Sequence, residues 1–243
     1  MSGATGVLAI ARAELRMLVR NKAVAAVAIL MPLGIGLYAA FSVERNPGGA
    51  GAVAGLQVLV MLGIGVYATA TTTLASRRKD LFLKRLRSGT LPDSAILAGL
   101  LLPVALVAVV QIAIIFGVLA TVTGVTPGNI TLLGVGVVAA ALMCVGVAMA
   151  TSAVTVSAEQ AQVTSVPFLL AILAGGIWVS STGLDELTWI KRLAPGGAVS
   201  EVVSGAWAGM TWTDALPGLL ALVAWATASA ADGLRFFRWE PRH

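Results

Sequence analysis

The amino-acid sequence predicts an all-α membrane protein with six transmembrane helices. Of its 243 residues, 58% are hydrophobic and only 11% are charged, and the mean hydropathy is +0.93. Soluble domains average about 25% charged residues, so this chain lacks the charge to cover a water-facing globule. Six long apolar stretches, none containing a charged residue, have the length of spanning helices. A transmembrane β-barrel is disfavoured because barrel strands alternate apolar and polar residues.

The predicted spans cover residues 23–43, 52–75, 96–122, 131–150, 163–179 and 216–231. Proline lies within three of them, at Pro32, Pro103 and Pro167. Membrane helices tolerate proline where neighbouring groups satisfy the freed carbonyl, so we expect kinks rather than helix ends. The lone cysteine, Cys144, lies in an apolar run and is expected to pack as a small hydrophobic residue. We expect a single transmembrane domain over residues 1–243.

The distribution of Lys and Arg predicts the orientation of the spans. Thirteen of the sixteen fall on one side: Arg12, Arg16, Arg20 and Lys22 before the first span, Arg77, Arg78, Lys79, Lys84, Arg85 and Arg87 between spans two and three, and Arg235, Arg238 and Arg242 after span six. The other side has only Arg45, Lys191 and Arg192. The positive-inside rule then predicts that both termini and the 76–92 loop are cytoplasmic.

Residues 1–22 have the pattern of an amphipathic helix that lies on the inner leaflet. Three arginines at every fourth position share one face, while Val7, Leu8, Ala11, Leu15 and Leu18 lie broadly opposite. Glu14 is the one interruption of that apolar arc. The alternative is a frayed basic tail.

The 76–92 segment reads SRRKDLFLKRLRSGTLP, in which apolar residues interrupt a dense basic stretch that Gly89 and Pro92 close. The apolar residues are Leu81, Phe82, Leu83 and Leu86. A short helix here would insert its Leu/Phe edge into a groove on a cytoplasmic partner. The alternative is a basic anchor that only sets topology, although an anchor needs no apolar edge.

The 180–214 connection is too charged to cross the membrane, yet it is not a plain loop. Apolar residues recur at helical spacing on both sides of Pro195-Gly196-Gly197, from Leu184 to Ala194 and from Ala198 to Met210. We expect two short amphipathic helices that form an outer re-entrant hairpin. The tryptophans Trp178, Trp189, Trp207 and Trp212 are typical of a membrane–water interface. The alternative is a surface loop without a role in transport.

The spans contain uncharged polar side chains that either hold helices together or line a path. They are Tyr38, Gln57, Tyr67, Gln111, Thr69, Thr71, Thr72 and Thr73. The lack of charge in the spans disfavours a proton relay or a voltage sensor. The only histidine is His243, and no G-x-x-x-x-G-K-[ST] motif occurs, so we expect neither a metal site, nor an intramembrane hydrolase, nor a P-loop. Energy for transport would have to come from another polypeptide.

The whole plan resembles the permease subunits of type-2 ATP-binding-cassette exporters, of the multidrug and antibiotic-efflux kind. Residues 11–38, ARAELRMLVRNKAVAAVAILMPLGIGLY, resemble that family's entry into its first span. Residues 77–111, RRKDLFLKRLRSGTLPDSAILAGLLLPVALVAVVQ, resemble its coupling segment and third span. Residues 175–205, GGIWVSSTGLDELTWIKRLAPGGAVSEVVSG, resemble its outer hairpin. One departure is that Trp178 is followed by Val179-Ser180-Ser181, without the proline often found there.

The resemblance implies a transporter of two permeases, either two copies or a copy and a paralogue, with two ATPase subunits. ATP and Mg would be bound by the partner ATPase, so this chain would be no enzyme and would need no cofactor. The ATPase contact would involve Arg78, Leu81, Phe82, Leu86 and Arg87. The substrate path would run along spans one, two and five, with Tyr38, Gln57 and Tyr67 as candidates.

The resemblance also implies a multi-pass protein of the bacterial plasma membrane. Spans with few aromatic residues and no charge favour a hydrophobic or amphipathic substrate, such as a drug, an antibiotic or a lipid. Membrane lipids are expected partners and nucleic acid is not. A passive channel or membrane scaffold with no ATPase is the alternative function, and an intramembrane enzyme is a third option.

Overall fold

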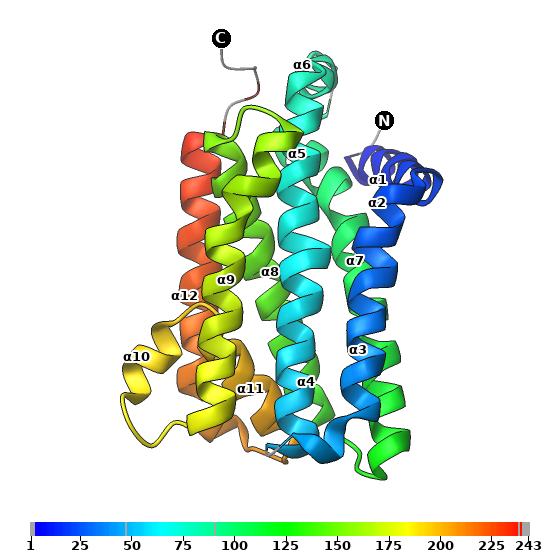
Figure 1. Cartoon of the computed structure of the whole chain (residues 1–243). Coiled ribbons are helices and arrows are strands. Elements are labelled where there is room, and N and C mark those ends of the chain that lie inside the picture. Colours follow the sequence, from blue (N-terminus) through cyan, green and yellow to red (C-terminus); the bar gives the residue numbers. More distant parts are fainter. Residues whose placement is uncertain (1–2, 47, 90, 238, 240–243) are drawn as a thin grey trace.

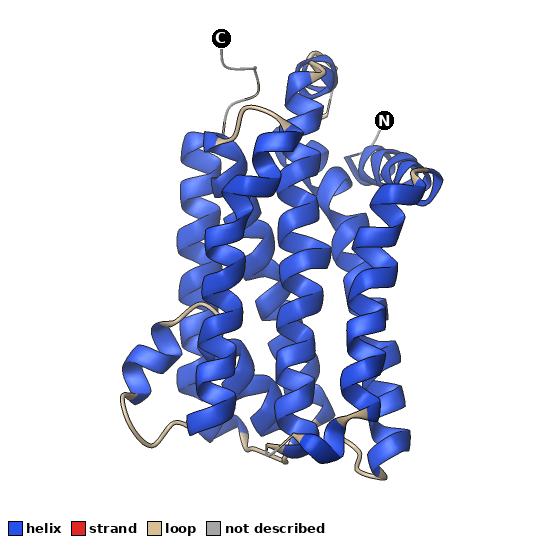
Figure 2. Ribbon diagram, in the orientation of Figure 1, coloured by secondary structure: helices blue, strands red, loops and turns tan. Residues whose placement is uncertain are grey.

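The computed structural model describes residues 3–46, 48–89, 91–237 and 239, which form helices joined by turns and loops, with no strand among them (Figures 1 and 2). Arg238, Arg242 and His243 lie outside the described residues. The elements are α1 (Gly3–Arg20), α2 (Lys22–Ala25), η1 (Ala26–Leu30), α3 (Met31–Phe41), η2 (Val43–Arg45), α4 (Gly49–Val60), η3 (Met61–Ala68), α5 (Thr69–Lys79), α6 (Phe82–Arg87), α7 (Asp93–Thr123), α8 (Ile130–Val154), α9 (Ala158–Thr182), α10 (Thr188–Leu193), α11 (Gly197–Trp207) and α12 (Trp212–Phe236).

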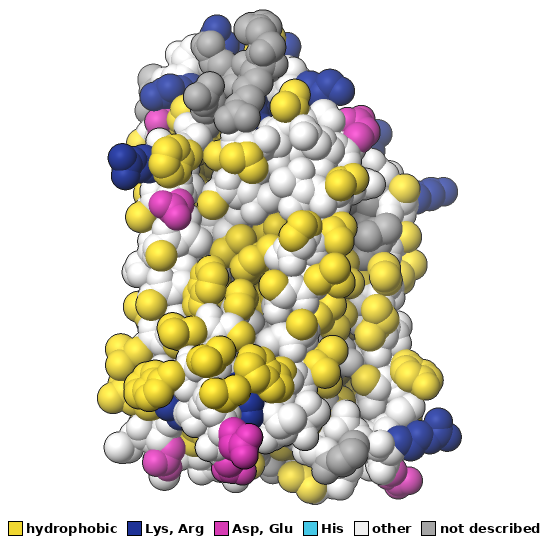
Figure 3. Space-filling model, turned by 60° about the vertical axis from the view of Figure 1, so that its left-hand side comes forward, with side chains coloured by type: hydrophobic (Ala, Val, Ile, Leu, Met, Phe, Trp, Pro, Cys, Tyr) yellow, Lys and Arg dark blue, Asp and Glu magenta, His cyan; other side chains and the backbone are white. Residues whose placement is uncertain are grey.

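The predicted spans are confirmed as helices. Among the described residues, five helices are long and apolar enough to cross a membrane: Gly49–Lys79, Asp93–Thr123, Ile130–Val154, Ala158–Thr182 and Trp212–Phe236. The first span is a shorter apolar helix, Ala28–Phe41, within an unbroken helical run over residues 22–41. Hydrophobic side chains gather in the middle of the surface and most charged side chains lie toward its two ends (Figure 3). This distribution is what a hydrocarbon layer with water on both sides requires.

The helices begin where the sequence supplies capping side chains. Asn129, Ser157 and Thr211 each accept a hydrogen bond from the backbone N–H three residues further on, which satisfies a donor in the first turn of α8, α9 and α12. Helix α12 continues past the predicted span and includes Asp232 and Arg235 at its end. Helix α12 is therefore longer than the predicted span, because the apolar pattern marks only the part of the helix that lies in the apolar layer.

The prolines within the spans do not end them, as predicted. Pro103 and Pro167 lie inside α7 and α9, and Pro32 lies in the first turn of α3, directly after the π-helical turn η1. A proline at position 32 removes the hydrogen bond to the carbonyl of Ala28. Gln111 on α7 compensates, because its Nε2 donates to the carbonyl of Ile29 at 2.8 Å and lies 3.4 Å from that of Ala28. This glutamine therefore holds two helices together.

The hairpin of two short helices is confirmed as α10 and α11, with the break at Pro195-Gly196-Gly197. Helix α11 lies inside the bundle against α4, α8, α9 and α12, and nearly all its residues are buried. Trp207 was expected at a membrane–water interface, but it is buried. Its ring centre lies 5.4 Å from that of Phe116. Trp189 on α10 and Trp212 are exposed, which suits an interface.

Two contacts hold the hairpin in place. Arg192 donates to the Glu201 carboxylate from Nη2 at 2.6 Å and from Nε at 2.8 and 2.9 Å, and this contact raises the pKa of Arg192. A Cβ atom at Gly196 would lie 1.7 Å from the carbonyl oxygen of Ile172, so the backbones of α9 and the turn approach more closely than any side chain allows. The turn between α10 and α11, which places α11 inside the bundle, therefore requires glycine at position 196.

We predict that Gly196→Ala destabilises the protein. The backbone φ of −93° is open to alanine, so the effect comes from the overlap with Ile172 alone. We expect a loss of about 1–3 kcal/mol in the free energy of unfolding, measured by thermal unfolding in detergent. Gly117→Ala is the matched control, because a Cβ there meets nothing within 4 Å. Equal unfolding temperatures for the two variants would contradict the role of Gly196.

Candidate functional site at the basic end of the bundle

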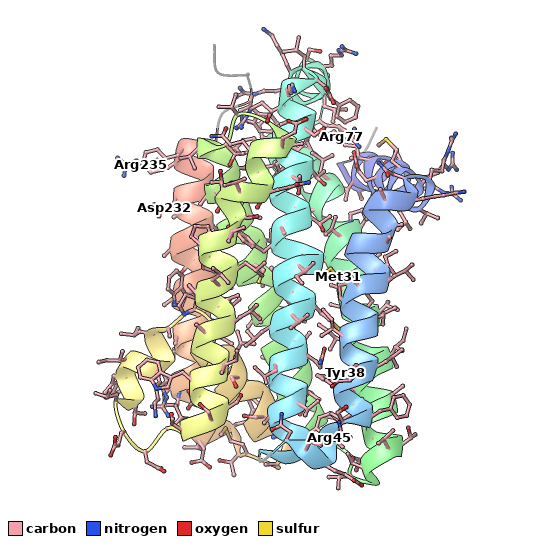
Figure 4. The ribbon with its side chains drawn as sticks, viewed as in Figure 1. Met31, Tyr38, Arg45, Arg77, Asp232 and Arg235 are labelled. Atoms are coloured by element: carbon pink, nitrogen blue, oxygen red, sulfur yellow. The ribbon has the colours of Figure 1, made fainter. Side chains whose placement is uncertain are left out.

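Helix α1, the tip helix α6 and the last turn of α12 lie at the same end of the bundle (Figure 1). Figure 4 shows Arg77 and Arg235 at this end and Arg45 at the opposite end. The three cation clusters that were predicted to share one side of the membrane therefore lie at one end of the bundle, in the part of them that the structure describes. We call this the basic end.

Arg77, in the last turn of α5, joins span two to helix α1. Its Nη2 donates to Oε2 of Glu14 at 2.9 Å, and the Glu14 side chain is buried. The face of α1 that packs on the bundle is therefore the row Gly6, Ile10, Glu14 and Leu18, at a spacing of four. In the predicted apolar arc, Leu8 and Leu15 are exposed and Leu18 is buried, while Glu14, which interrupts the arc, packs against the bundle through its ion pair with Arg77.

Arg78 is buried at 2% exposure and is held by the end of α8. Its Nη2 donates to the backbone carbonyl of Ser152 at 2.8 Å and to that of Thr155. These carbonyls lie at the C-terminus of α8, where that of Ser152 also accepts a hydrogen bond from the backbone N–H of Thr155. A guanidinium is suited to this position because it adds positive charge to the negative end of the helix. In this structure Arg78, expected at an ATPase contact, is engaged within its own chain.

Helix α6 is a short projection that is anchored by its apolar residues. Leu83 is fully buried, and Phe82 and Leu86 are half-buried against the core. The Arg77 guanidinium lies 5.3 Å from the centre of the Phe82 ring. The Leu/Phe edge that was expected to enter a partner's groove therefore packs mainly on this chain.

The outward surface of α6 consists of basic side chains and one leucine. Leu81 precedes the helix in the left-handed conformation, at φ 56°, and its side chain is 42% exposed. Lys84, Arg85 and Arg87 are exposed around it. Arg87 lies 3.3 Å from the Asp93 carboxylate and 5.1 Å from the centre of the Trp239 ring. We call Leu81 with these three cations the α6 tip.

The three path candidates are not brought together. Tyr67 is fully buried, with its hydroxyl 3.2 Å from Oγ1 of Thr151 and its ring 4.9 Å from that of Phe168. Gln57 is buried in α4. Tyr38 is 70% exposed on an outward face of α3 (Figure 4), and Phe41 of α3 and Leu30 at the end of η1 are also exposed. Two of the candidates thus contribute to packing within the chain, and one faces its surroundings.

A large cleft that was not predicted from the sequence opens beside Arg77. Its volume is about 1210 Å³, and its walls come from the α1–α2 junction, η3, α5, α7 and the start of α9. The charged residues that line it are Glu14, Arg20, Lys22 and Arg77. Glu14, Arg20 and Lys22 are close together in the sequence, and the distant Arg77 meets them because α1 crosses the end of the bundle. Among the described residues, no group of three or more His, Cys, Asp or Glu could hold a metal ion.

The comparisons with known proteins agree with this architecture. The family model described as ABC-2 type transporter matches residues 5–207, from the start of α1 to the end of α11. A search of curated proteins gave no match.

We predict that Arg78→Leu lowers the free energy of unfolding by about 2 kcal/mol or more, because it removes the buried guanidinium that donates to the carbonyls of Ser152 and Thr155. Thermal unfolding of the purified protein in detergent measures this loss. Arg85→Leu, on the exposed side of α6, is the control and should unfold at the temperature of the parent chain. If the Arg78→Leu variant were as stable as the control, Arg78 would not anchor α5 to the end of α8.

Proposed function

This chain belongs to the ABC-2 type transporter family, and we propose that it is the permease of an exporter driven by a separate ATPase. The observation that carries the proposal is the α6 tip, a basic projection with one exposed leucine at the end of an otherwise apolar bundle. Its three cations suit an acidic rim, and Leu81 suits a small apolar pocket within that rim. The ABC ATPase that the family implies is the partner we propose for it.

The α6 tip is suited to transmitting a push into the bundle. Leu83 fixes α6 rigidly, since it is fully buried, and the turn at Leu81 connects α6 directly to α5. Helix α5 in turn is tied to α1 through Arg77 and to α8 through Arg78. Movement of the ATPase against the tip would therefore shift span two, α1 and the end of α8 together.

We propose that the basic end faces the cytoplasm of a bacterial cell and that the chain is a multi-pass protein of the plasma membrane. The cations of α1, of α6 and of the end of α12 all support this orientation by the positive-inside rule. The same orientation brings the α6 tip to the side on which ATP is available.

A second copy or a paralogue would complete the transporter by covering the exposed face of α3. That face carries Leu30, Tyr38 and Phe41, each about two-thirds exposed or more. Tyr38 is then the path candidate at the surface between two permeases. Gln57 and Tyr67 are buried and would reach a path only after the helices move apart. A surface of this kind, apolar with few polar groups, suits a hydrophobic or amphipathic substrate such as a drug, an antibiotic or a lipid.

We predict that Leu81→Asn abolishes most of the coupling between permease and ATPase. Asparagine tolerates the left-handed backbone of this position, so the turn is kept while the apolar side chain is lost. The measurement is ATPase activity of the purified complex with and without candidate substrates. We expect the stimulated activity to fall by about tenfold, because an apolar anchor at an interface contributes about 1–2 kcal/mol.

The matched control is Leu187→Asn. Leu187 is also an exposed leucine in the left-handed conformation, at φ 53°, but it lies before α10 at the opposite end of the bundle. This variant should keep normal stimulation, and Leu81→Met should restore it. Failure of any ATPase to co-purify with the parent chain would favour a passive channel or scaffold instead.

A further inference from the structure

The cleft at the basic end is separate from the α6 tip, and the proposed contact with the ATPase does not involve it. It lies between the α1–α2 junction and α5, and α7 contributes Pro103 and Val104 to its walls. At about 1210 Å³ it exceeds the range of about 300–1,000 Å³ that is typical of drug-sized ligands. It therefore has room for a molecule with one or more long chains.

The charged groups of the cleft are mostly positive. Arg20 and Lys22 are exposed side chains at the junction of α1 and α2, and no ion pair is formed by either within the described part of the chain. Arg77 adds a third cation from α5, and Glu14 is already paired with it. The two unpaired cations are thus left to attract an anion.

The rest of the lining is uncharged. Ile64, Ala68, Pro103 and Val104 supply apolar surface, and Ala68 precedes a row of hydroxyl residues on α5. Within this row, Thr69 and Thr72 donate their hydroxyl protons to carbonyls of the preceding turn, so their bonding needs are met inside the helix. The cleft accordingly combines cations at the end of the bundle with a neutral wall that runs along span two.

We propose that this cleft binds one anionic membrane lipid, with its phosphate between Arg20, Lys22 and Arg77 and its acyl chains along α5 and α7. A phosphate head group with a hydrocarbon tail matches both parts of the lining, and basic pockets between membrane helices are suited to such head groups. Free phosphate would use the cations but not the apolar wall. The lipid would bridge α1 and span two, in addition to the Glu14–Arg77 ion pair.

The test is lipid binding to the purified, delipidated full chain in neutral detergent, measured by native mass spectrometry. The probes are phosphatidylglycerol, phosphatidylcholine with the same acyl chains, and inorganic phosphate. We expect tight binding of one phosphatidylglycerol, much weaker binding of phosphatidylcholine, and no competition by inorganic phosphate. Arg20→Gln with Lys22→Gln should weaken phosphatidylglycerol binding by about thirtyfold.

The matched control is Arg12→Gln with Arg16→Gln, which removes two cations from the same helix but outside the cleft. It should change the affinity by less than about twofold if the cleft, rather than general surface charge, binds the lipid. Thr73→Phe fills the cleft and leaves every cation in place, and it should also reduce binding. Equal loss in both double variants, full binding by Thr73→Phe, or competition by inorganic phosphate would each overturn the proposal.

Discussion

Two adjacent arginines at the end of α5 hold the basic end of the bundle together. Arg77 reaches to Glu14 on α1, and Arg78 reaches to the last carbonyls of α8. Because neighbouring side chains on a helix point in different directions, one short segment ties span two to elements on two sides. The position of α1, the rigidity of α6 and the shape of the cleft all depend on this junction.

The membrane explains why the junction is at the end of span two and not within it. A charged side chain in hydrocarbon is costly, so the arginines lie where α5 leaves the apolar layer. Deeper in the bundle the polar contacts are uncharged, such as Gln111 with the carbonyls next to Pro32 and Tyr67 with Thr151. The charged contacts are thus placed at the end of the bundle, outside the apolar layer.

Much of the fold could be predicted from the sequence because it follows from local patterns. Apolar runs gave the spans, and Pro195-Gly196-Gly197 gave the break between α10 and α11. Long-range pairing could not be predicted. The sequence pattern shows Glu14 only as an interruption of an apolar face, because its partner Arg77 comes from α5. It likewise places Leu83 on an exposed edge, whereas this side chain is buried in the bundle.

The candidate site was predictable in kind but not residue by residue. The basic segment after span two forms the short helix α6 at one end of the bundle, yet Arg78 is held inside, and the cleft combines residues of the segment 14–22 with the distant Arg77. Periodicity shows which residues share a face, but it does not show whether that face meets lipid, a partner or the chain's own core. Tyr38 and Tyr67, similar in sequence context, differ completely in burial for this reason.

The most direct test of the account is photo-crosslinking of the intact transporter in membranes. A photoreactive amino acid is placed at Leu81 in one preparation and at Leu187 in another, two exposed positions with the same backbone conformation at opposite ends. The account predicts a crosslink to an ABC ATPase subunit from position 81 and none from position 187. No ATPase adduct from position 81, or an adduct from position 187, would contradict it.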